Sequence, residues 1–295
     1  MNYDEIWRPL AQRYGSGEAR AIARYVLDTL FGLSLTDIAG GAVERLSEHD
    51  QQQLATVMKR LEEGEPVQYA LGTAFFGMRQ FHVRKGVLIP RPETYELCQW
   101  IIESVSNGKA DGNEEPLHIL DIGTGSGCIA CTLAAELPEA EVTAWDISDD
   151  ALRIAAENAK RNNVSVTFEK VDALNPPLLN REGSGVGLPE LGLHIIVSNP
   201  PYICNKEAKD MEPHVLDNEP HVALFVPDDD PLLFYREITR FASKALKPGG
   251  MLFFELNALY AEDTLKMVCS MGFTNVTLRN DQFGKPRMLC GKKEH

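Results

Sequence analysis

The segment HILDIGTGSGCIACTLA, residues 118–134, is the clearest indication of the fold. An apolar run is followed by glycines at positions 123, 125 and 127 and then by a run of small and apolar residues. This order predicts a buried strand, a tight loop and a helix, in which the loop backbone can approach a ligand at the helix N-terminus. Tight packing of the strand against the helix would explain the same glycines without a ligand.

The spacing of the glycines separates this loop from two classes of phosphate-binding loop. The dinucleotide fingerprint requires glycine at position 128, where this chain has Cys128, and the chain lacks the Gly-Lys-Ser/Thr of a P-loop. A GxGxG loop with Asp121 before it is instead the form found at S-adenosylmethionine (AdoMet) sites. We therefore expect an AdoMet-binding loop here.

Strand-like segments alternate with helix-like segments along the rest of the chain. Further strands are expected in EVTAWDIS (141–148), SVTFEKVD (165–172), HIIVSNPPY (194–202) and MLFFELN (251–257). This alternation predicts an α/β fold with a Rossmann-like, doubly wound and mainly parallel sheet. The tail, 273–280 followed by 285–293, is expected to add a closing antiparallel hairpin. The polar stretches 107–116 and 180–192 are expected to be surface loops.

The first seventy residues have a helical pattern instead. In EARAIARYVLDTLFG (18–32) the apolar residues fall on one face of a helix. A second amphipathic run extends from Leu54 to Leu61, and Ser47 with Asp50 is expected to cap its start. A small helical bundle is predicted.

The pattern changes at Ala74. Phe81, Val83 and the apolar run 87–89 suggest a β-hairpin that is ended by Pro90 and Pro92. We therefore expect three parts: a helical bundle at 1–72, a β-hairpin linker at 73–93 and the α/β domain at 94–295.

Acidic residues end the next two expected strands. Asp146 is placed to bind both hydroxyls of a ribose, and the alternative is a helix N-cap, a role that suits Asp149 or Asp150 better. Asp172, or the backbone amide of its neighbour Ala173, can meet the edge of an adenine. A solvated strand end is the alternative for Asp172.

The fourth expected strand ends in VSNPPYI, residues 197–203, where the prolines stop the sheet. The side-chain oxygen of Asn199 and the carbonyl of Pro200 can accept the two hydrogens of a planar NH₂ group, on which Tyr202 can stack. Holding both hydrogens favours a transition state in which the nitrogen lone pair points at the sulfonium methyl. We expect this corner to be a catalytic clamp that needs no strong base.

Composition and charge limit the possible partners. The net charge is −14, whereas a protein that holds duplex nucleic acid by its phosphates normally has a basic surface. No apolar run approaches the roughly 18 residues of a membrane span. We expect a soluble, cytoplasmic monomer with no membrane association and no nucleic-acid substrate.

Cys128 and Cys131 form a CxxC pair, but a structural zinc site of this kind needs a second pair. Both fall in the first turns of the helix after the glycine loop, where small apolar residues pack against the sheet. We therefore expect core residues with reduced thiols and no metal site.

Several segments together resemble the protein-(glutamine-N5) methyltransferases of the PrmC/HemK type. They are GEPVQYALGTAFFG (64–77), VLIPRPETYEL (87–97), LDIGTGSGCIA (120–130), VSNPPYI and NEPHVAL (218–224). The resemblance covers nearly the whole chain. It implies an N-terminal helical bundle, a hairpin linker and a catalytic domain that uses AdoMet as its cofactor. The implied reaction is methylation of the glutamine amide in the Gly-Gly-Gln motif of class 1 peptide chain release factors.

The resemblance also implies roles by position. AdoMet would contact Gly123, Thr124, Gly125, Ser126, Gly127, Asp146, Ala173 and Asn199, and Asp172 is a further candidate from its place at a strand end. The glutamine would contact Asn199, Pro200, Pro201 and Tyr202, of which Asn199, Pro200 and Tyr202 are the catalytic candidates. Apart from the resemblance, every nucleotide-type motif lies beyond residue 118, so residues 1–72 are expected to recognise the protein substrate.

Two other functions are compatible with parts of this pattern. A DNA or RNA adenine-N6 methyltransferase also holds a planar NH₂ group, so the Asn-Pro-Pro-Tyr corner does not separate the two enzymes. The acidic charge and the lack of a basic target-recognition segment argue against a nucleic-acid substrate. A non-catalytic AdoMet-binding module would have no need of the intact corner.

Overall fold

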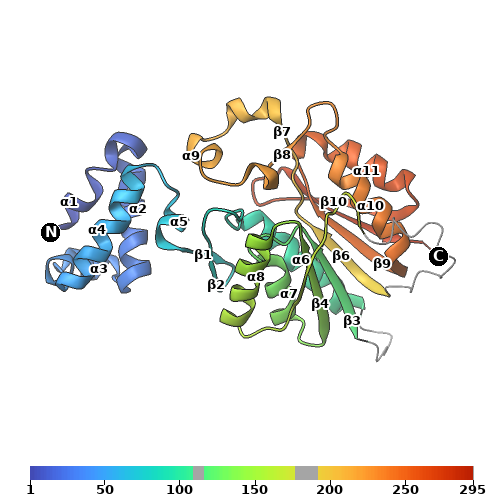
Figure 1. Ribbon diagram of the computed structural model, residues 1–295, viewed down its shortest axis with the longest axis horizontal. Helices are drawn as coiled ribbons and strands as arrows, with labels where there is room; N and C mark the ends of the chain where they lie inside the picture. Colours follow the sequence, from blue (N-terminus) through green and yellow to red (C-terminus); the bar gives the residue numbers. More distant parts are fainter. Residues whose placement is uncertain (109–115, 177–191, 295) are drawn as a thin grey trace. The chain divides into compact units, whose positions relative to one another are not determined.

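The computed structural model describes residues 1–108, 116–176 and 192–294, which form two compact units (Figure 1). The smaller unit comprises Met1–Thr73, Val83–Lys85 and Glu212–Asn218; the larger unit comprises Ala74–His82, Gly86–Met211 and Glu219–His295. The two polar stretches expected to be surface loops fall largely outside the described residues. None of the described helices is long and apolar enough to cross a membrane.

Helices make up the smaller unit. Their bounds are α1 Tyr3–Trp7, α2 Ala11–Phe31, α3 Leu35–Ala39, η1 Val43–Arg45, α4 Glu48–Glu62, α5 Val67–Leu71 and α9 Pro213–Leu216. The apolar faces of α2 and α4 share one core, in which Val26, Leu54 and Leu61 are fully buried. Ser47 caps α4 as expected, because its hydroxyl accepts the backbone N–H of Asp50 at 3.2 Å.

A seven-stranded sheet organises the larger unit. Its strands are β3 Leu117–Ile122, β4 Ala140–Asp146, β5 Thr167–Lys170, β6 Leu193–Ser198, β9 Leu246–Glu255, β10 Phe273–Asn280 and β11 Pro286–Lys293. They lie in the order β10-β11-β9-β6-β3-β4-β5, and the strands from β9 to β5 are parallel. β11 runs antiparallel to both β9 and β10, which confirms the closing hairpin.

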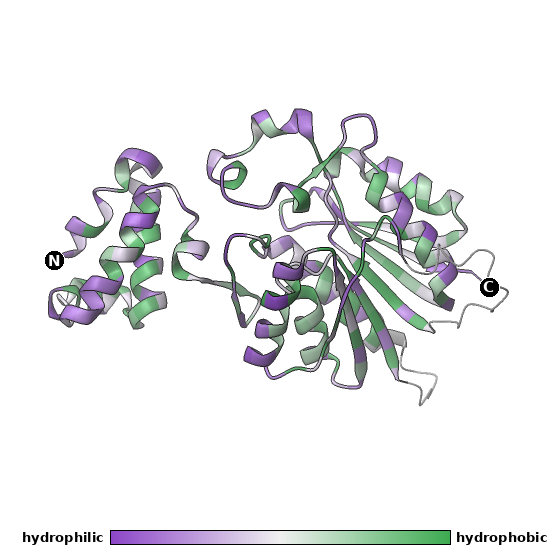
Figure 2. Cartoon of the chain, in the orientation of Figure 1, coloured by the Kyte–Doolittle hydropathy of each residue, from purple (hydrophilic) through white to green (hydrophobic). Residues whose placement is uncertain are grey.

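Helices cover both faces of this sheet. They are α6 Pro92–Gly108, α7 Cys128–Glu136, α8 Asp149–Arg161, α10 Leu233–Ala245 and α11 Ala261–Ser270. Successive strand residues point to opposite faces: Ile119 and Phe253 join the core under α6, α7 and α8, while their neighbours Leu120 and Phe254 join the core under α10 and α11. Because both faces are buried, the strands are apolar along most of their length, as the green in Figure 2 shows. The doubly wound fold is confirmed.

A short hairpin, β1 Thr73–Phe76 with β2 Arg79–His82, precedes the sheet. The apolar run 87–89, which the sequence suggested as part of the hairpin, forms no strand. Instead of pairing with a strand, the backbone N–H of Ile89 donates a hydrogen bond to a side-chain oxygen of Glu219 at 3.3 Å. The remaining short elements are β7 Ile203–Cys204, η4 Asn205–Asp210, η5 His221–Ala223, β8 Phe225–Val226 and η6 Ala258–Tyr260.

Candidate active site

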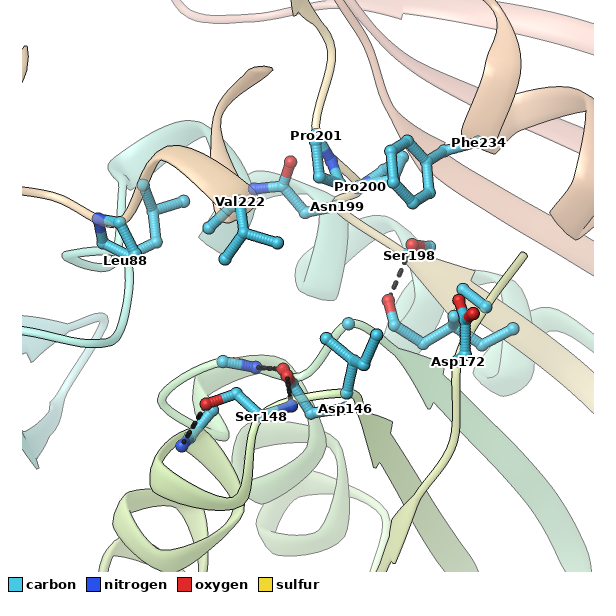
Figure 3. Close-up of a pocket in the computed structure, with 18 of the residues that line it drawn as sticks. Leu88, Asp146, Ser148, Asp172, Ser198, Asn199, Pro200, Pro201, Val222 and Phe234 are labelled. Atoms are coloured by element: carbon cyan, nitrogen blue, oxygen red, sulfur yellow. Dashed lines mark hydrogen bonds between the residues drawn. The ribbon is translucent and has the colours of Figure 1, made fainter. Parts of the chain in front are cut away.

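The carboxyl ends of the parallel strands border a cavity of about 270 Å³ in the larger unit (Figure 3). Ligand sites of doubly wound sheets form at this edge, because all the parallel strands end there. The residues proposed from the sequence that line the cavity are Gly123, Gly125, Asp146, Asp172, Ala173, Asn199, Pro200 and Pro201. Several apolar residues that the sequence did not indicate also line the cavity, among them Leu88, Val222, Phe234 and Ile238.

The loop glycines have two different functions. Gly123 and Gly125 have φ angles of 75° and 55°, and a Cβ added to either would meet no atom within 4 Å. A Cβ on Gly127 would lie 3.0 Å from the Cβ of Ala155, so this glycine allows α7 to approach α8. Room for a ligand therefore explains the first two glycines, and close packing explains the third.

Thr124 and Ser126 do not line the cavity; they are buried within the loop. The Thr124 hydroxyl donates to Asp121 Oδ2 at 2.6 Å, and the Ser126 carbonyl accepts a hydrogen bond from Asn158 Nδ2 at 2.9 Å. Asn158, a buried residue of α8 that the sequence analysis missed, also exchanges hydrogen bonds with the backbone of His82 in the hairpin. These hydrogen bonds fix the conformation of the loop on the side away from the cavity.

The start of α8 corrects one expectation. The cap is Ser148, whose hydroxyl accepts the N–H of Ala151 at 3.2 Å, so the expectation that Asp149 or Asp150 caps the helix is wrong. Asp149 and Asp150 are the next two residues and lie in the first turn, where negative charges interact favourably with the positive end of the helix dipole.

Asp146 is not the cap either, and its carboxylate remains at the cavity. Its Oδ2 accepts the N–H of Gly125 at 2.8 Å, and its Oδ1 accepts the N–H of Ser148 at 2.9 Å. In Figure 3 it lies on one side of the cavity, with Asn199 and the two prolines on the other. Asp146 thus joins the glycine loop to the end of β4.

Asp172 and Ala173 follow β5 and line the cavity together. The carboxylate of Asp172 accepts hydrogen bonds from the N–H of Leu174 and from Nδ2 of Asn175, both at 2.9 Å. Asp172 therefore already has local partners for both oxygens.

The Asn-Pro-Pro-Tyr corner follows β6. Asn199 and the two prolines line the cavity, whereas Tyr202 is partly buried against the core under α10 and does not. The Tyr202 hydroxyl donates to Glu255 Oε1 at 3.1 Å. Nδ2 of Asn199 donates to Thr94 Oγ1 at 3.2 Å. The stacking role expected for Tyr202 stays a prediction.

Glu255 and Thr94 are polar residues that the sequence analysis missed. β9 pairs with β6 so that Phe254 lies opposite Ser198, and Glu255 and Asn199 therefore leave the sheet next to each other. Glu255 is only 2% exposed, and its Oε2 accepts the Thr94 hydroxyl at 2.5 Å. The sequence contained a signal for Glu255, because this residue, like Asp146, is a polar residue at the end of an apolar parallel strand.

An ion pair between a half-exposed arginine and a buried glutamate supports one wall of the cavity. Arg91 Nη2 lies 2.5 Å from Oε1 of Glu219, whose side chain is 1% exposed. Glu219 directly precedes the segment that contributes Pro220 and Val222 to the cavity. The pair therefore joins the PRPET and NEPHVAL segments that the sequence analysis singled out.

Cys128 and Cys131 are buried in the core beside the sheet. Burial raises the pKa of each thiol to about 12, which disfavours the thiolate that a metal would need. Within residues 1–108, 116–176 and 192–294, no group of His, Cys, Asp and Glu could hold a metal ion. The structure favours the core interpretation of this pair.

Burial also raises the pKa values of acidic residues around the site. It raises the pKa of Asp121 to about 7, and it raises the pKa of Asp146 and Glu255 against the hydrogen bonds that each accepts. Oδ1 of Asp121 has no hydrogen-bond partner within the part of the chain that is described. A ligand that brings positive charge or hydrogen-bond donors would stabilise the ionised form of such buried acids.

Comparison with known proteins identifies the family. The model of the PrmC N-terminal domain matches residues 8–72, and a methyltransferase domain model matches residues 119–202. The release factor glutamine methyltransferase of Bacteroides thetaiotaomicron is 41% identical, over 98% of this chain and 98% of its own. The chain belongs to the release factor glutamine methyltransferase family. A relative of the same name from Flavobacterium psychrophilum is 42% identical, over 95% of this chain and 94% of its own. Another from Streptococcus pneumoniae is 35% identical, over 92% of this chain and 91% of its own.

Solved structures agree on the fold of this methyltransferase. The T. thermophilus 16S rRNA N2 G1207 methyltransferase, in complex with AdoMet and guanosine, aligns with a TM-score of 0.52 at 17% identity, over 75% of this chain and 50% of that one. The hMettl16 catalytic domain aligns with the same TM-score and identity, over 81% and 80%. At this level of identity the likeness concerns the fold alone.

The raised pKa of Asp121 predicts a pH-dependent stability difference. Because the folded chain holds this proton up to about pH 7 and the unfolded chain loses it near pH 4, folding stability should fall as pH rises between these values. Asp121→Asn removes the effect. The variant should therefore gain up to about 4 kcal/mol of unfolding free energy relative to wild type across this window, at about 1.4 kcal/mol per pKa unit.

Urea titrations of both proteins at about pH 4.5 and about pH 7.5 measure the difference. Other titrating groups are shared by the two proteins, so their contributions cancel. A stability difference that stays constant between the two pH values would contradict the assignment of the buried proton to Asp121.

Proposed function

We propose that this methyltransferase transfers the methyl group of AdoMet to the side-chain amide nitrogen (N5) of the glutamine in the Gly-Gly-Gln motif of class 1 peptide chain release factors. One observation carries the proposal: an Asn-Pro-Pro corner lines the cavity of a chain that is 41% identical to a release factor glutamine methyltransferase over 98% of its length. The Gly-Gly-Gln target comes from the family resemblance of the sequence.

The cavity suits AdoMet. Gly123 and Gly125 leave their backbone open to a ligand, and each oxygen of Asp146 accepts one N–H and keeps a further lone pair for a ribose hydroxyl. Apolar walls that include Ala173 and Phe234 are suited to a purine. AdoMet would supply an electrophilic methyl group on a positively charged sulfur, a charge that the acids at this edge favour.

The corner suits an amide substrate. An amide nitrogen is a poor nucleophile, because its lone pair is delocalised into the carbonyl. The side-chain oxygen of Asn199 and the carbonyl of Pro200 can accept its two hydrogens and hold the nitrogen in a pyramidal arrangement, which stabilises the transition state more than the ground state. Pro201 has no N–H that could compete for these acceptors.

The smaller unit is proposed to recognise the protein substrate. Every residue that lines the cavity belongs to the larger unit, which supports the expectation that AdoMet binds without the helical bundle. The bundle has a hydrophobic core of its own. We retain the division into a helical bundle at 1–72, a hairpin linker at 73–93 and a catalytic domain at 94–295 as part of this proposal.

The substrate can be tested directly with AdoMet labelled at the methyl group. Label should enter a class 1 release factor at the glutamine of Gly-Gly-Gln, and Gln→Ala in the release factor should abolish the incorporation. Oligonucleotide duplexes should take up none, because a chain with a net charge of −14 is poorly suited to binding phosphates. Label in adenine and none in the release factor would refute the proposal and support a nucleic-acid methyltransferase.

Asp146 provides the test of the cofactor site. Asp146→Ala should weaken AdoMet binding by roughly 2–4 kcal/mol, the contribution of one or two charge-assisted hydrogen bonds. The matched control is Asp149→Ala, which removes an exposed aspartate three positions further along the chain. This variant should bind AdoMet with wild-type affinity. Titration calorimetry that finds both variants alike would show that Asp146 does not hold the ribose.

The role of the smaller unit is tested by deleting residues 1–72. The remaining chain should bind AdoMet within about 3-fold of wild type and should methylate a short Gly-Gly-Gln peptide similarly. It should methylate the full-length release factor at least about 30-fold more slowly, because the larger docking surface is lost. Circular dichroism checks that the shortened chain is folded. Wild-type activity on the full-length release factor would refute the division of labour.

A further inference from the structure

We propose that Thr94 and Glu255 are positioning residues, which orient the side-chain amide of Asn199 so that its oxygen faces the substrate. The inference rests on the proposed function of the Asn-Pro-Pro-Tyr corner and concerns how that corner is held. The three residues come from α6, from the end of β9 and from the turn after β6, and hydrogen bonds join them in a line.

The line begins at Glu255. An ionised carboxylate can only accept hydrogen bonds, and Glu255 accepts the hydroxyl of Thr94 at 2.5 Å and that of Tyr202 at 3.1 Å. A separation of 2.5 Å is typical of a hydroxyl that donates to a charged oxygen. Both hydroxyl protons are therefore directed toward Glu255. Burial raises the pKa of this carboxyl, and the hydrogen bonds from Thr94 and Tyr202 and the charge of Arg287 oppose that rise.

Thr94 passes this constraint to Asn199. A threonine hydroxyl has a single proton, which Thr94 already donates to Glu255, so it can only accept from any further partner. The Asn199 group that lies 3.2 Å from it must therefore be the NH₂ of the amide. A flipped amide would place two acceptors against each other and leave both unsatisfied.

The other half of the amide is then available to the substrate. Asn199 lines the cavity, and its Oδ1 has no hydrogen-bond partner among the described residues. An oxygen in this position accepts a hydrogen from a substrate NH₂, whereas an NH₂ in this position would face it donor to donor. The same orientation disfavours a glutamate substrate, whose carboxylate has no hydrogen to donate.

The first test removes the Thr94 hydroxyl and keeps the shape of the side chain. Thr94→Val should lose at least about 30-fold in single-turnover transfer to a release factor, with the Kd for AdoMet within about 3-fold of wild type. Thr94→Ser restores the hydroxyl and should return the rate to within about 3-fold. The matched control is Thr264→Val, which removes a buried hydroxyl in α11 that donates to the carbonyl of Tyr260 at 2.8 Å and should leave both quantities unchanged.

A double-mutant cycle separates positioning from a general loss of stability. If Thr94 acts only through Asn199, then Thr94→Val combined with Asn199→Ala should be no slower than Asn199→Ala alone. Additive losses would overturn the proposal, as would a Thr94→Val enzyme with wild-type turnover. Should Thr94→Val fail to fold, Glu255→Gln takes its place in the cycle, because the carboxamide keeps the shape but replaces one acceptor with a donor.

A readout without catalysis keeps this inference distinct from the proposed function. The side-chain NH₂ signals of Asn199 in ¹H–¹⁵N spectra are identified by their loss in Asn199→Ala. Thr94→Val and Glu255→Gln should both shift them, Thr94→Ser should return them toward the wild-type position, and Thr264→Val should leave them in place. Unchanged signals would overturn the proposal. A wild-type enzyme that transfers nothing to a release factor would refute the proposed function alone, and these spectra would still test the orientation of Asn199.

Discussion

Parallel pairing of β6 with β3 on one side and β9 on the other is the constraint on which the site depends. It brings the ends of three strands to one edge of the sheet, so that the glycine loop, Asn199 and Glu255 become neighbours although they are far apart in the sequence. A slip of one residue in this register would exchange the two faces of the strand. Since both faces carry a packed core, such a slip would expose and disrupt both of them. The packing of the cores therefore holds the geometry of the site.

Asp146 and Glu255 accept hydrogen bonds from neutral donors, and neither forms a close ion pair within the described part of the chain. Removing a carboxylate from water is costly, and the cost is offset when its oxygens accept well-placed hydrogen bonds. Asp146 receives two backbone N–H groups and Glu255 receives two hydroxyls. Each donor is thereby oriented by the charge it serves. Asp146 thereby aligns the backbone of the glycine loop, and Glu255 aligns the hydroxyls beside the Asn-Pro-Pro-Tyr corner.

The sequence predicted the features that depend on local pattern and missed those that depend on register. Glycine spacing, strand–helix alternation and the Asn-Pro-Pro-Tyr corner are written within short segments, and the structure contains each of them. The contact between Thr94 in α6 and Glu255 in β9 requires knowing which strand that helix packs against. Gly123 and Gly127 are the same residue type, and only the position of Ala155 distinguishes a glycine needed for packing from one beside open space. Ser148 could not be preferred over Asp149 as the cap of α8, because both are good capping residues.

The strand order also divides the work between the two halves of the proposed site. Asp146 ends β4 and Asn199 follows β6, with β3 and its glycine loop between them. Neighbouring strands lie about 4.8 Å apart, so Asp146 and Asn199 start roughly 10 Å from each other at the sheet edge. On the far side of Asn199, β9 contributes Glu255, which holds the corner without facing the cavity. The two prolines and this hydrogen-bonded support place both acceptors before the substrate arrives, and electrostatic stabilisation of the transition state is most effective when no reorganisation is needed. A rigid pair of neutral acceptors beside an acidic edge is thus suited to an uncharged amide, and it is poorly suited to a substrate that carries phosphates.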